Sequence, residues 1–293
     1  TVALSTSGAA TEGTDYTDGS GNIDDIVISA GSTTGTVSFT PSDDSVYEDD
    51  EAATIAISSV SGGSATESGT QTVTITITDN ESAGTVTLAV SASSIAENAG
   101  SSLTLTATLS SVSDEDVTVS LSTSGTATEG TDYTDGSGNI DDITISAGDT
   151  TGTVNFTPTD DSTYEGNETA TIAISGVSGA DATESGSQSV SVTITENESA
   201  PTVTLTVSAT SIAENAGSSV TVTATLSGAT HENVTVAIST SGTATEGTDY
   251  TDGSGVVDDI TISAGSTTGT VNFTPTDDSV YEGNETATLS VNS

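Results

Sequence analysis

The chain has 293 residues, of which 43 are Asp or Glu, one is His and none is Lys or Arg, so its formal net charge is −43. This charge excludes nucleic acids and anionic membrane surfaces as partners, because no Lys or Arg is available to neutralise phosphate groups. Cys is also absent, which excludes disulfides and thiolate chemistry. No apolar run approaches the roughly 18 residues that span a bilayer, so we expect no membrane insertion in this segment.

A block of 117 residues repeats along the sequence: Tyr16, Tyr133 and Tyr250 lie one period apart. A fixed period indicates an array of similar units, and this period is long enough for a domain. We therefore expect a complete unit at 83–199 between two partial ones, at 1–82 and 200–293. The first would lack its first strands and the third its last strand. Since the chain also begins with Thr, we expect a segment of a longer protein.

High acidity with few aromatic residues is typical of disordered chains, and the alternative is a fold whose charge is neutralised by cations. The pattern of the complete unit favours a fold. Apolar residues alternate there with Thr and Ser, as in half-buried antiparallel strands. The expected strands cover residues 86–90, 103–109, 117–121, 143–145, 154–156, 172–174 and 190–194. About seven short strands separated by Gly- and Asp-rich turns predict an all-β Greek-key sandwich in each unit.

Four motifs of the complete unit resemble the Calx-β domain family, in the expected order and spacing. They are Ser-Ile-Ala-Glu-Asn-Ala-Gly at 94–100, the stretch 125–133 that ends in Thr-Asp-Tyr, the acidic stretch 159–168, and Ile-Thr-Glu-Asn-Glu at 194–198. The resemblance covers the whole chain. It implies immunoglobulin-like antiparallel β-sandwiches in an elongated array, with calcium bound by loops at one end of each sandwich. Family members of this kind occur in exchanger calcium sensors and as tandem arrays in extracellular adhesion and matrix proteins.

The resemblance also implies a set of calcium ligands, carried over motif by motif. In the complete unit they are Glu97, Asp132, Asp160, Asp161, Glu165, Glu168, Glu196, Asn197 and Glu198. In the first unit they are Asp15, Asp43, Asp44, Glu48, Glu51, Asp79, Asn80 and Glu81, and in the third they are Glu214, Asp249, Asp277, Asp278, Glu282 and Glu285. The family's last strand often ends in three Asp residues, whereas this chain has Thr-Glu-Asn-Glu and Thr-Asp-Asn-Glu, so the number of ions per unit stays open.

The residue chemistry is consistent with these expectations. Calcium takes six to eight oxygen ligands in flexible geometry, and adjacent carboxylates such as Asp160 and Asp161 repel unless a cation lies between them. A solvated acidic surface is the alternative, and we prefer it for Glu115, Asp149 and Asp181. The segment 135–142 carries acids at alternate positions, and we expect a polar hairpin turn there rather than a second metal site.

Catalysis is not expected, because one His and no Cys or Lys leave almost no nucleophile–base pair. His231 is expected to be exposed. The leading hypothesis is a structural segment of an extracellular, cell-surface fibre, filament or adhesin stalk, in which calcium stiffens short linkers at 81–84 and 198–201. The alternative is an adhesin module that binds ligands or glycans through calcium, with the variable stretch 110–116 and its counterpart 227–233 as the candidate loop. The expected partners are calcium and neighbouring repeats, and lateral self-association into filaments stays open.

Overall fold

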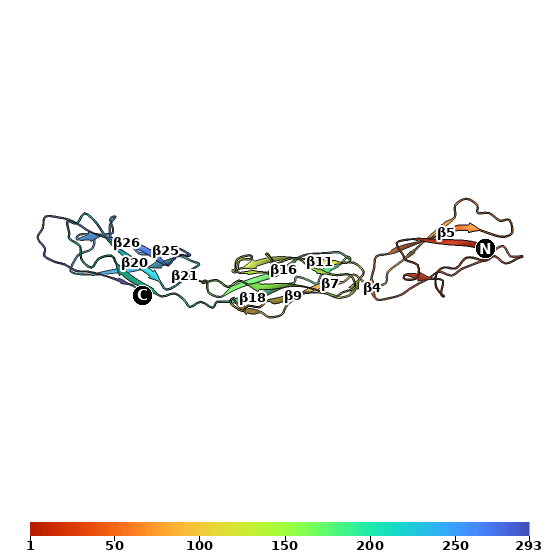
Figure 1. Cartoon of the computed structure of the whole chain (residues 1–293), viewed down its shortest axis with the longest axis horizontal. Coiled ribbons are helices and arrows are strands. Elements are labelled where there is room, and N and C mark those ends of the chain that lie inside the picture. Colours follow the sequence, from red (N-terminus) through yellow and green to blue (C-terminus); the bar gives the residue numbers. More distant parts are fainter. Residues whose placement is uncertain (293) are drawn as a thin grey trace.

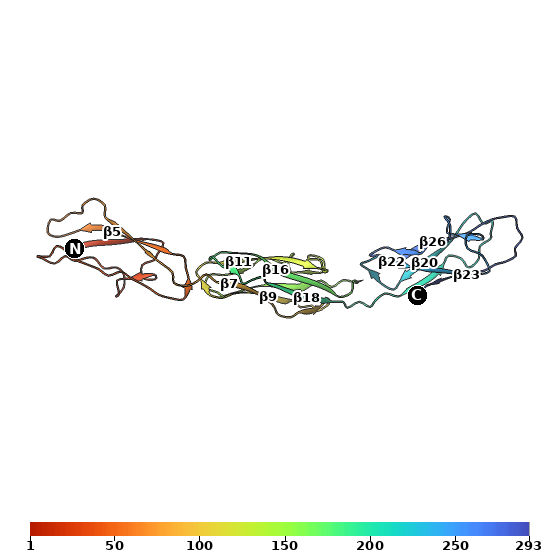
Figure 2. The same ribbon diagram turned by 180° about the vertical axis from the view of Figure 1, so that it is seen from behind.

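The computed structural model describes residues 1–292, and none of them forms a helix. The chain is instead a row of three β-rich bodies joined end to end (Figure 1). Viewed from behind, the same bodies remain in line, with the central unit between the other two (Figure 2). Among residues 1–292 there is accordingly no helix long and apolar enough to cross a membrane.

The central unit is a sandwich of two five-stranded sheets. One sheet has the order β13-β11-β16-β18-β8, formed by Ile143–Ile145, Val117–Gly125, Glu168–Ser178, Ser189–Thr195 and Ser94–Ala96. The other has the order β12-β14-β9-β7-β17, formed by Tyr133–Thr134, Thr151–Pro158, Leu103–Leu109, Thr85–Val90 and Thr183–Glu184. The seven strands expected from the alternation are all present, and short strands such as β8 and β12 extend the edges.

The core of the central unit lies between the two sheets. Its fully buried side chains include Leu105, Val117, Ile143, Ile172 and Phe156. These residues occupy the alternate positions of their strands, so every second side chain faces inward, as the pleat requires. Tyr133 stacks on Phe156 with ring centroids 4.6 Å apart, and the same pair recurs in both neighbouring units.

The outer units contain many of the counterparts of the central strands, but the first unit has no strand at the positions of β13 and β17, and the third has none at those of β8 and β15. In the first unit they are β1 (Val2–Gly8), β2 (Tyr16–Thr17), β3 (Thr40–Pro41), β4 (Val46–Tyr47), β5 (Glu51–Val60) and β6 (Thr72–Ile77). In the third unit they are β19 (Val203–Val207), β20 (Val220–Leu226), β21 (Ala229–Thr230), β22 (Val234–Val236), β23 (Ile238–Gly242), β24 (Tyr250–Thr251), β25 (Ile260–Ile262), β26 (Thr268–Pro275) and β27 (Ala287–Val291).

Strand loss in the outer units follows from missing partners. Strand β14 pairs along its length with β9, whereas its counterpart β3 has no such partner and keeps two residues. The opened sandwich also exposes apolar side chains: Ile28 is 41% exposed, whereas its counterpart Ile145 is 1% exposed. The central unit is therefore the one with both sheets complete.

Several acids of the repeated segment have local structural roles. The carboxylate of Glu129 accepts hydrogen bonds from the Thr123 hydroxyl and the Ile140 amide, at 2.8 and 2.6 Å. Asp142 accepts from the amide of Leu121 at 3.0 Å, at the bulge where β11 shifts register against β16. Asp135 accepts from the amides of Ser137 and Gly138 and so forms a tight polar turn. The segment 135–142 is therefore a hydrogen-bonded turn, as expected.

Neighbouring units meet through short parallel strand pairs. Strand β4 of the first unit pairs with β10 (Val112–Ser113) of the second. Strand β15 (Thr163–Tyr164) of the second pairs in the same way with β21 of the third. Figure 1 shows β4 and β21 at the two places where units adjoin. The segment that precedes the long strand β5 or β16 of one unit thus contacts the connection between β9 and β11, or between β20 and β22, of the next.

Candidate metal centre

Two groups of carboxylates lie at one end of the central sandwich. The first is Glu97 with Glu196 and Glu198, and the second is Asp132 with Glu165 and Glu168; within each group one oxygen per residue lies within 4.8 Å of the others. Glu97 follows β8 and the acids at 196 and 198 follow β18, which pairs with β8. Pairing of β8 with β18 thus brings together acids that are about 100 positions apart in the sequence.

Glu196 is the most firmly held acid of the first group. Its Oε2 accepts hydrogen bonds from the amides of Glu165 and Gly166, at 2.6 and 2.9 Å, and its Oε1 accepts from Asn197 and Glu198, at 2.8 and 2.9 Å. Burial acts to raise the pKa of Glu196, but the hydrogen bonds led by the one from Glu198 outweigh it and lower the pKa to about 2. Glu196 is therefore a carboxylate that stays ionised.

Glu97 lies opposite Glu196 in a different electrostatic environment. It is 7% exposed, and its Oε1 accepts a hydrogen bond from the Asp161 amide at 3.1 Å. Burial raises the pKa of Glu97 to about 7, and the nearby charges of Glu196 and Glu198 add to the rise against that hydrogen bond. The pKa values of Glu97 and Glu196 differ strongly although the two carboxylates are neighbours. This difference indicates more negative charge at the site than the hydrogen bonds of the protein can stabilise.

The second group shows the same excess of negative charge. Burial, followed by the charge of Asp132 and a side-chain hydrogen bond with it, raises the pKa of Glu168 to about 7. Burial and then the charges of Asp132 and Asp161 raise the pKa of Glu165. Asp132 itself is held by the Thr128 amide, which donates to its Oδ2 at 2.6 Å. With no Lys or Arg in the sequence, a proton or a cation must offset these charges.

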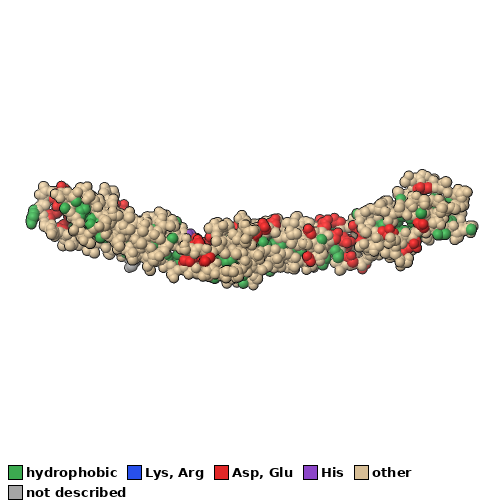
Figure 3. All heavy atoms as spheres, in the orientation of Figure 1, with side chains coloured by type: hydrophobic (Ala, Val, Ile, Leu, Met, Phe, Trp, Pro, Cys, Tyr) green, Lys and Arg blue, Asp and Glu red, His purple; other side chains and the backbone are tan. Residues whose placement is uncertain are grey.

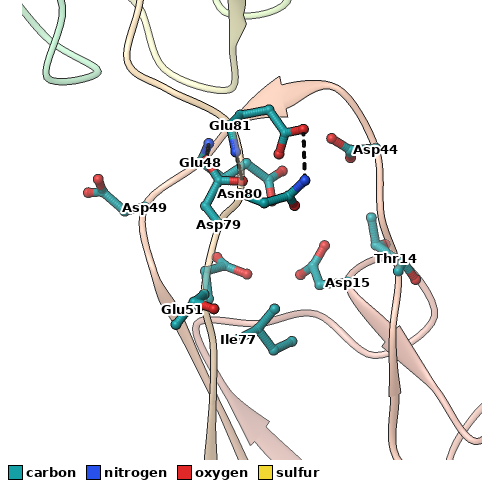
Figure 4. A pocket seen from close by; sticks show the side chains of 12 residues that line it. Thr14, Asp15, Asp44, Glu48, Asp49, Glu51, Ile77, Asp79, Asn80 and Glu81 are labelled. Carbon is teal, nitrogen blue, oxygen red and sulfur yellow. Dashed lines mark hydrogen bonds between the residues drawn. The ribbon is translucent and has the colours of Figure 1, made fainter.

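The second group recurs in all three units at one-period spacing. Its counterparts are Asp15 with Glu48 and Glu51, and Asp249 with Glu282 and Glu285. Figure 4 shows the first unit's group, with Asp15, Glu48 and Glu51 facing one hollow and Glu81 and Asn80 at its rim, joined by a 3.4 Å hydrogen bond. The acidic side chains form separate patches along the surface of the array rather than an even coat (Figure 3).

The donor set of the central unit fits a calcium ion. All members are carboxylates on strand ends and loops, which suits the oxygen preference and flexible geometry of calcium. In addition, Oε2 of Glu198 is buried and has no hydrogen-bond partner among residues 1–292. A buried carboxylate oxygen without a partner is costly, and a cation within the Glu97 group would satisfy it. In that case Glu97, Glu196 and Glu198 would hold one ion and Asp132, Glu165 and Glu168 another.

Other predicted ligands lie beside these groups without belonging to them. Asp161 donates its amide to Glu97 and accepts from the Thr163 amide, at 2.5 Å, so it shapes the loop. Asp79 accepts from the Glu48 amide at 3.0 Å, which matches the role of Glu196 in the central unit. The predicted residues outside the tight groups are Asp43, Asp44, Asp79, Asn80, Glu81, Asp160, Asp161, Asn197, Glu214, Asp277 and Asp278.

Sequence reasoning missed one supporting position. The side-chain oxygen of Asn167 accepts a hydrogen bond from the Glu196 amide at 3.0 Å, and Asp50, one period earlier, accepts from the Asp79 amide at 3.1 Å. The available signal was an oxygen-bearing side chain at this position in each unit, since Asn284 follows at the same spacing.

The variable stretch 110–116 is not a free tip. Its Val112 and Ser113 form β10 and pair with the preceding unit, and Ser113 is 3% exposed. The counterpart Thr230 is 9% exposed and lies in the equivalent pair. Pairing between units thus occupies the middle of this stretch, whereas Asp114, Glu115 and Asp116 stay exposed beside the junction. His231 at its end is 43% exposed in its side chain, as expected.

The fold and its acidic ends define a tandem array of β-sandwich modules. The Calx-beta domain model matches residues 1–81, 79–198 and 196–293, and the chain therefore belongs to the Calx-beta domain family. No curated protein sequence matches the chain.

Several solved structures are similar to this chain at low identity. The crystal structure of CBD12 from CALX1.2 is 19% identical with a TM-score of 0.33, and the match covers 64% of this chain and 74% of that one. The crystal structure titled calcium binding domain CBD12 of CALX1.1 is 20% identical with a TM-score of 0.32. The match covers 63% of this chain and 74% of that one. Invasin, a bacterial integrin-binding protein, is 17% identical with a TM-score of 0.27, and covers 89% of this chain and 44% of its own.

Proposed function

We propose that this chain is a segment of a long extracellular fibre or stalk whose junctions are stiffened by calcium. The observation that carries this proposal is the position of the acidic groups. In the first and second units the Asp15 and Asp132 groups adjoin the strand pair that leads into the next unit. The last ligand acids, Glu81 and Glu198, directly precede the connecting residues 82–84 and 199–201.

Calcium at such a position would act on both stability and geometry. Without a cation the carboxylates of each group repel one another, and this repulsion weakens the loops that carry the strand pairs. A bound cation would tie the loops after β15 and β18 to each other and so restrict the angle of the following unit. Ligand linkage gives about 2.7 kcal/mol at a hundredfold excess over the dissociation constant, which is significant for a protein with a lean core.

Small-angle scattering of the whole chain with calcium and with chelator tests the proposal. We expect the maximum dimension and the rod-like part of the curve to decrease when calcium is removed. The variant that combines Glu165→Gln with Glu168→Gln should show part of this change even in calcium, because one junction has lost its ligands. Asp149→Asn is the matched control for the second junction only, since Asp149 lies in the turn before β14, at the opposite end of the same sandwich, where that turn contacts Ser113 of the first junction. Curves that are identical with calcium and with chelator would refute the stiffening role.

A calcium-dependent adhesin module remains the competing proposal. The middle of the 110–116 stretch pairs with the preceding unit, so a ligand could reach only the exposed residues beside that pair. Calcium-dependent binding of the chain to immobilised glycans would nonetheless favour it over a purely structural role.

A further inference from the structure

The two junctions place one residue of the following unit in the same position. After the strand pair, the amide of Asp114 donates to the carbonyl of Tyr47 at 3.2 Å, and the amide of His231 donates to the carbonyl of Tyr164 at 3.3 Å. Positions 114 and 231 are one period of 117 apart. Equivalent backbone hydrogen bonds therefore fix two side chains of opposite chemical character at equivalent points.

The position is held from both sides. The turn before β14 donates the Gly148 amide to the Ser113 carbonyl at 2.8 Å, and the turn before β26 donates the Gly265 amide to the Thr230 carbonyl, also at 2.8 Å. Ser113 and Thr230 are themselves buried. The residue after each of them is consequently anchored between its own unit and the preceding one, and its location does not depend on a flexible loop.

The anchored residue lies beside the acids of the preceding unit. The carbonyls that it binds belong to Tyr47 and Tyr164, which immediately precede Glu48 and Glu165. Burial and then neighbouring carboxylates, Asp114 among them, raise the pKa of Glu48. Burial and carboxylates likewise raise the pKa of Glu165, but here His231 acts in the opposite direction. The following unit thus contributes to the electrostatic potential at the metal centre of the unit before it.

From this arrangement we infer that the residue at position 114 or 231 of the following unit sets the calcium affinity of the preceding unit's site. The inference rests on the proposed calcium-binding function. A carboxylate at this position adds negative potential and strengthens calcium binding, whereas an imidazole does not. The effect is an electrostatic one between the bound divalent cation and the side chain at position 114 or 231. The calcium affinity of one unit therefore depends on which residue the next unit carries at this position.

A pair of reciprocal substitutions tests the inference on the whole chain. His231→Asp should strengthen calcium binding at the second junction, and Asp114→Asn should weaken it at the first, each by about three- to tenfold for one unit charge near a divalent ion at the protein surface. The matched control is Thr206→Asp, which adds the same charge on the exposed side of β19 and should change the affinity by less than about twofold. All titrations are calorimetric, at one pH and one salt concentration.

The outcomes separate the inference from the function on which it rests. Calcium binding by the native chain, with the expected shifts in His231→Asp and Asp114→Asn, supports both. Native binding that neither substitution changes, or that Thr206→Asp changes equally, overturns the inference and leaves the function intact. No calcium uptake by the native chain overturns both. Adding Glu165→Gln and Glu168→Gln to His231→Asp removes two of the three carboxylates and should remove the gain with the site, and a gain that persists would show that the effect acts elsewhere and overturn the inference.

Discussion

Stability of the ion-free chain should fall as the pH rises from 5 to 8, and calcium should abolish that fall. The reason is the raised pKa of Glu97 and of Glu168, each about 7 instead of the ordinary 4.5. A carboxyl with a raised pKa binds its proton more tightly in the folded state. Its contribution is therefore favourable at low pH and is lost as the pH rises from the unfolded value of about 4.5 through the folded value of about 7.

The size of the effect follows from the shift. One pKa unit corresponds to about 1.4 kcal/mol, so a group moving from 4.5 to about 7 costs about 3 kcal/mol when it is fully ionised. Because part of this cost is already present at pH 5, about 2.5 kcal/mol remains for the interval from pH 5 to pH 8. Glu168 adds a smaller amount, because it is only half-buried and shares its charge with Asp132.

Thermal unfolding of the whole chain in chelator, followed by calorimetry at several pH values, measures this loss. Glu97→Gln should flatten the pH dependence of the transition that belongs to the central unit, because the amide cannot ionise. Glu196, whose pKa is lowered to about 2, acts in a separate window: its contribution is present above pH 4.5 and is lost as the pH falls toward 2. Equal stability at pH 5 and pH 8 without calcium would refute the reasoning.

Four further substitutions separate binding from structure. Glu165→Gln should weaken calcium binding and lower the calcium-dependent melting temperature, whereas Asp149→Asn should do neither; equal effects of the two would mean that the acids act only as diffuse charge. Glu129→Gln should cost about 1–3 kcal/mol of stability because it removes a paired acceptor, while a calorimetric titration should give an unchanged calcium affinity. Gly125→Ala should lower the melting temperature without calcium dependence, since φ is +130° and a Cβ would lie 2.0 Å from the Thr169 carbonyl oxygen; a neutral result would show that β11 can shift at that point.

The sandwich was predictable from the sequence because its signal is local. Alternation in segments such as 103–109 identifies which side chains face the core, and the structure places Leu105, Ala107 and Leu109 there. The array was predictable too, since the period of 117 residues is visible without any structural knowledge. Both features depend on patterns that a short stretch or a simple repeat can display.

Which acids accept structural hydrogen bonds and which belong to the candidate metal groups was less predictable. Glu129 and Asp132 are three positions apart in one motif, yet the first is a structural acceptor and the second joins the candidate metal group. The difference arises from Thr123 and Ile140, which reach Glu129 through the fold. Composition and spacing cannot reveal which carboxylate is already satisfied by hydrogen bonds.

The junctions were missed for a related reason. A two-residue strand such as β10 has no periodicity, so the 110–116 stretch looked like an exposed loop, and only the structure shows that it pairs with the unit before it. At both junctions the backbone pairing is the same, whereas the charges beside it differ: Asp49 and Asp50 of the first unit correspond to Gly166 and Asn167 of the second. The shared pairing fixes how units join, whereas the charges beside it differ from one junction to the other. If calcium stiffens the junctions as proposed, stiffness would vary along the array without any change in the fold of its units.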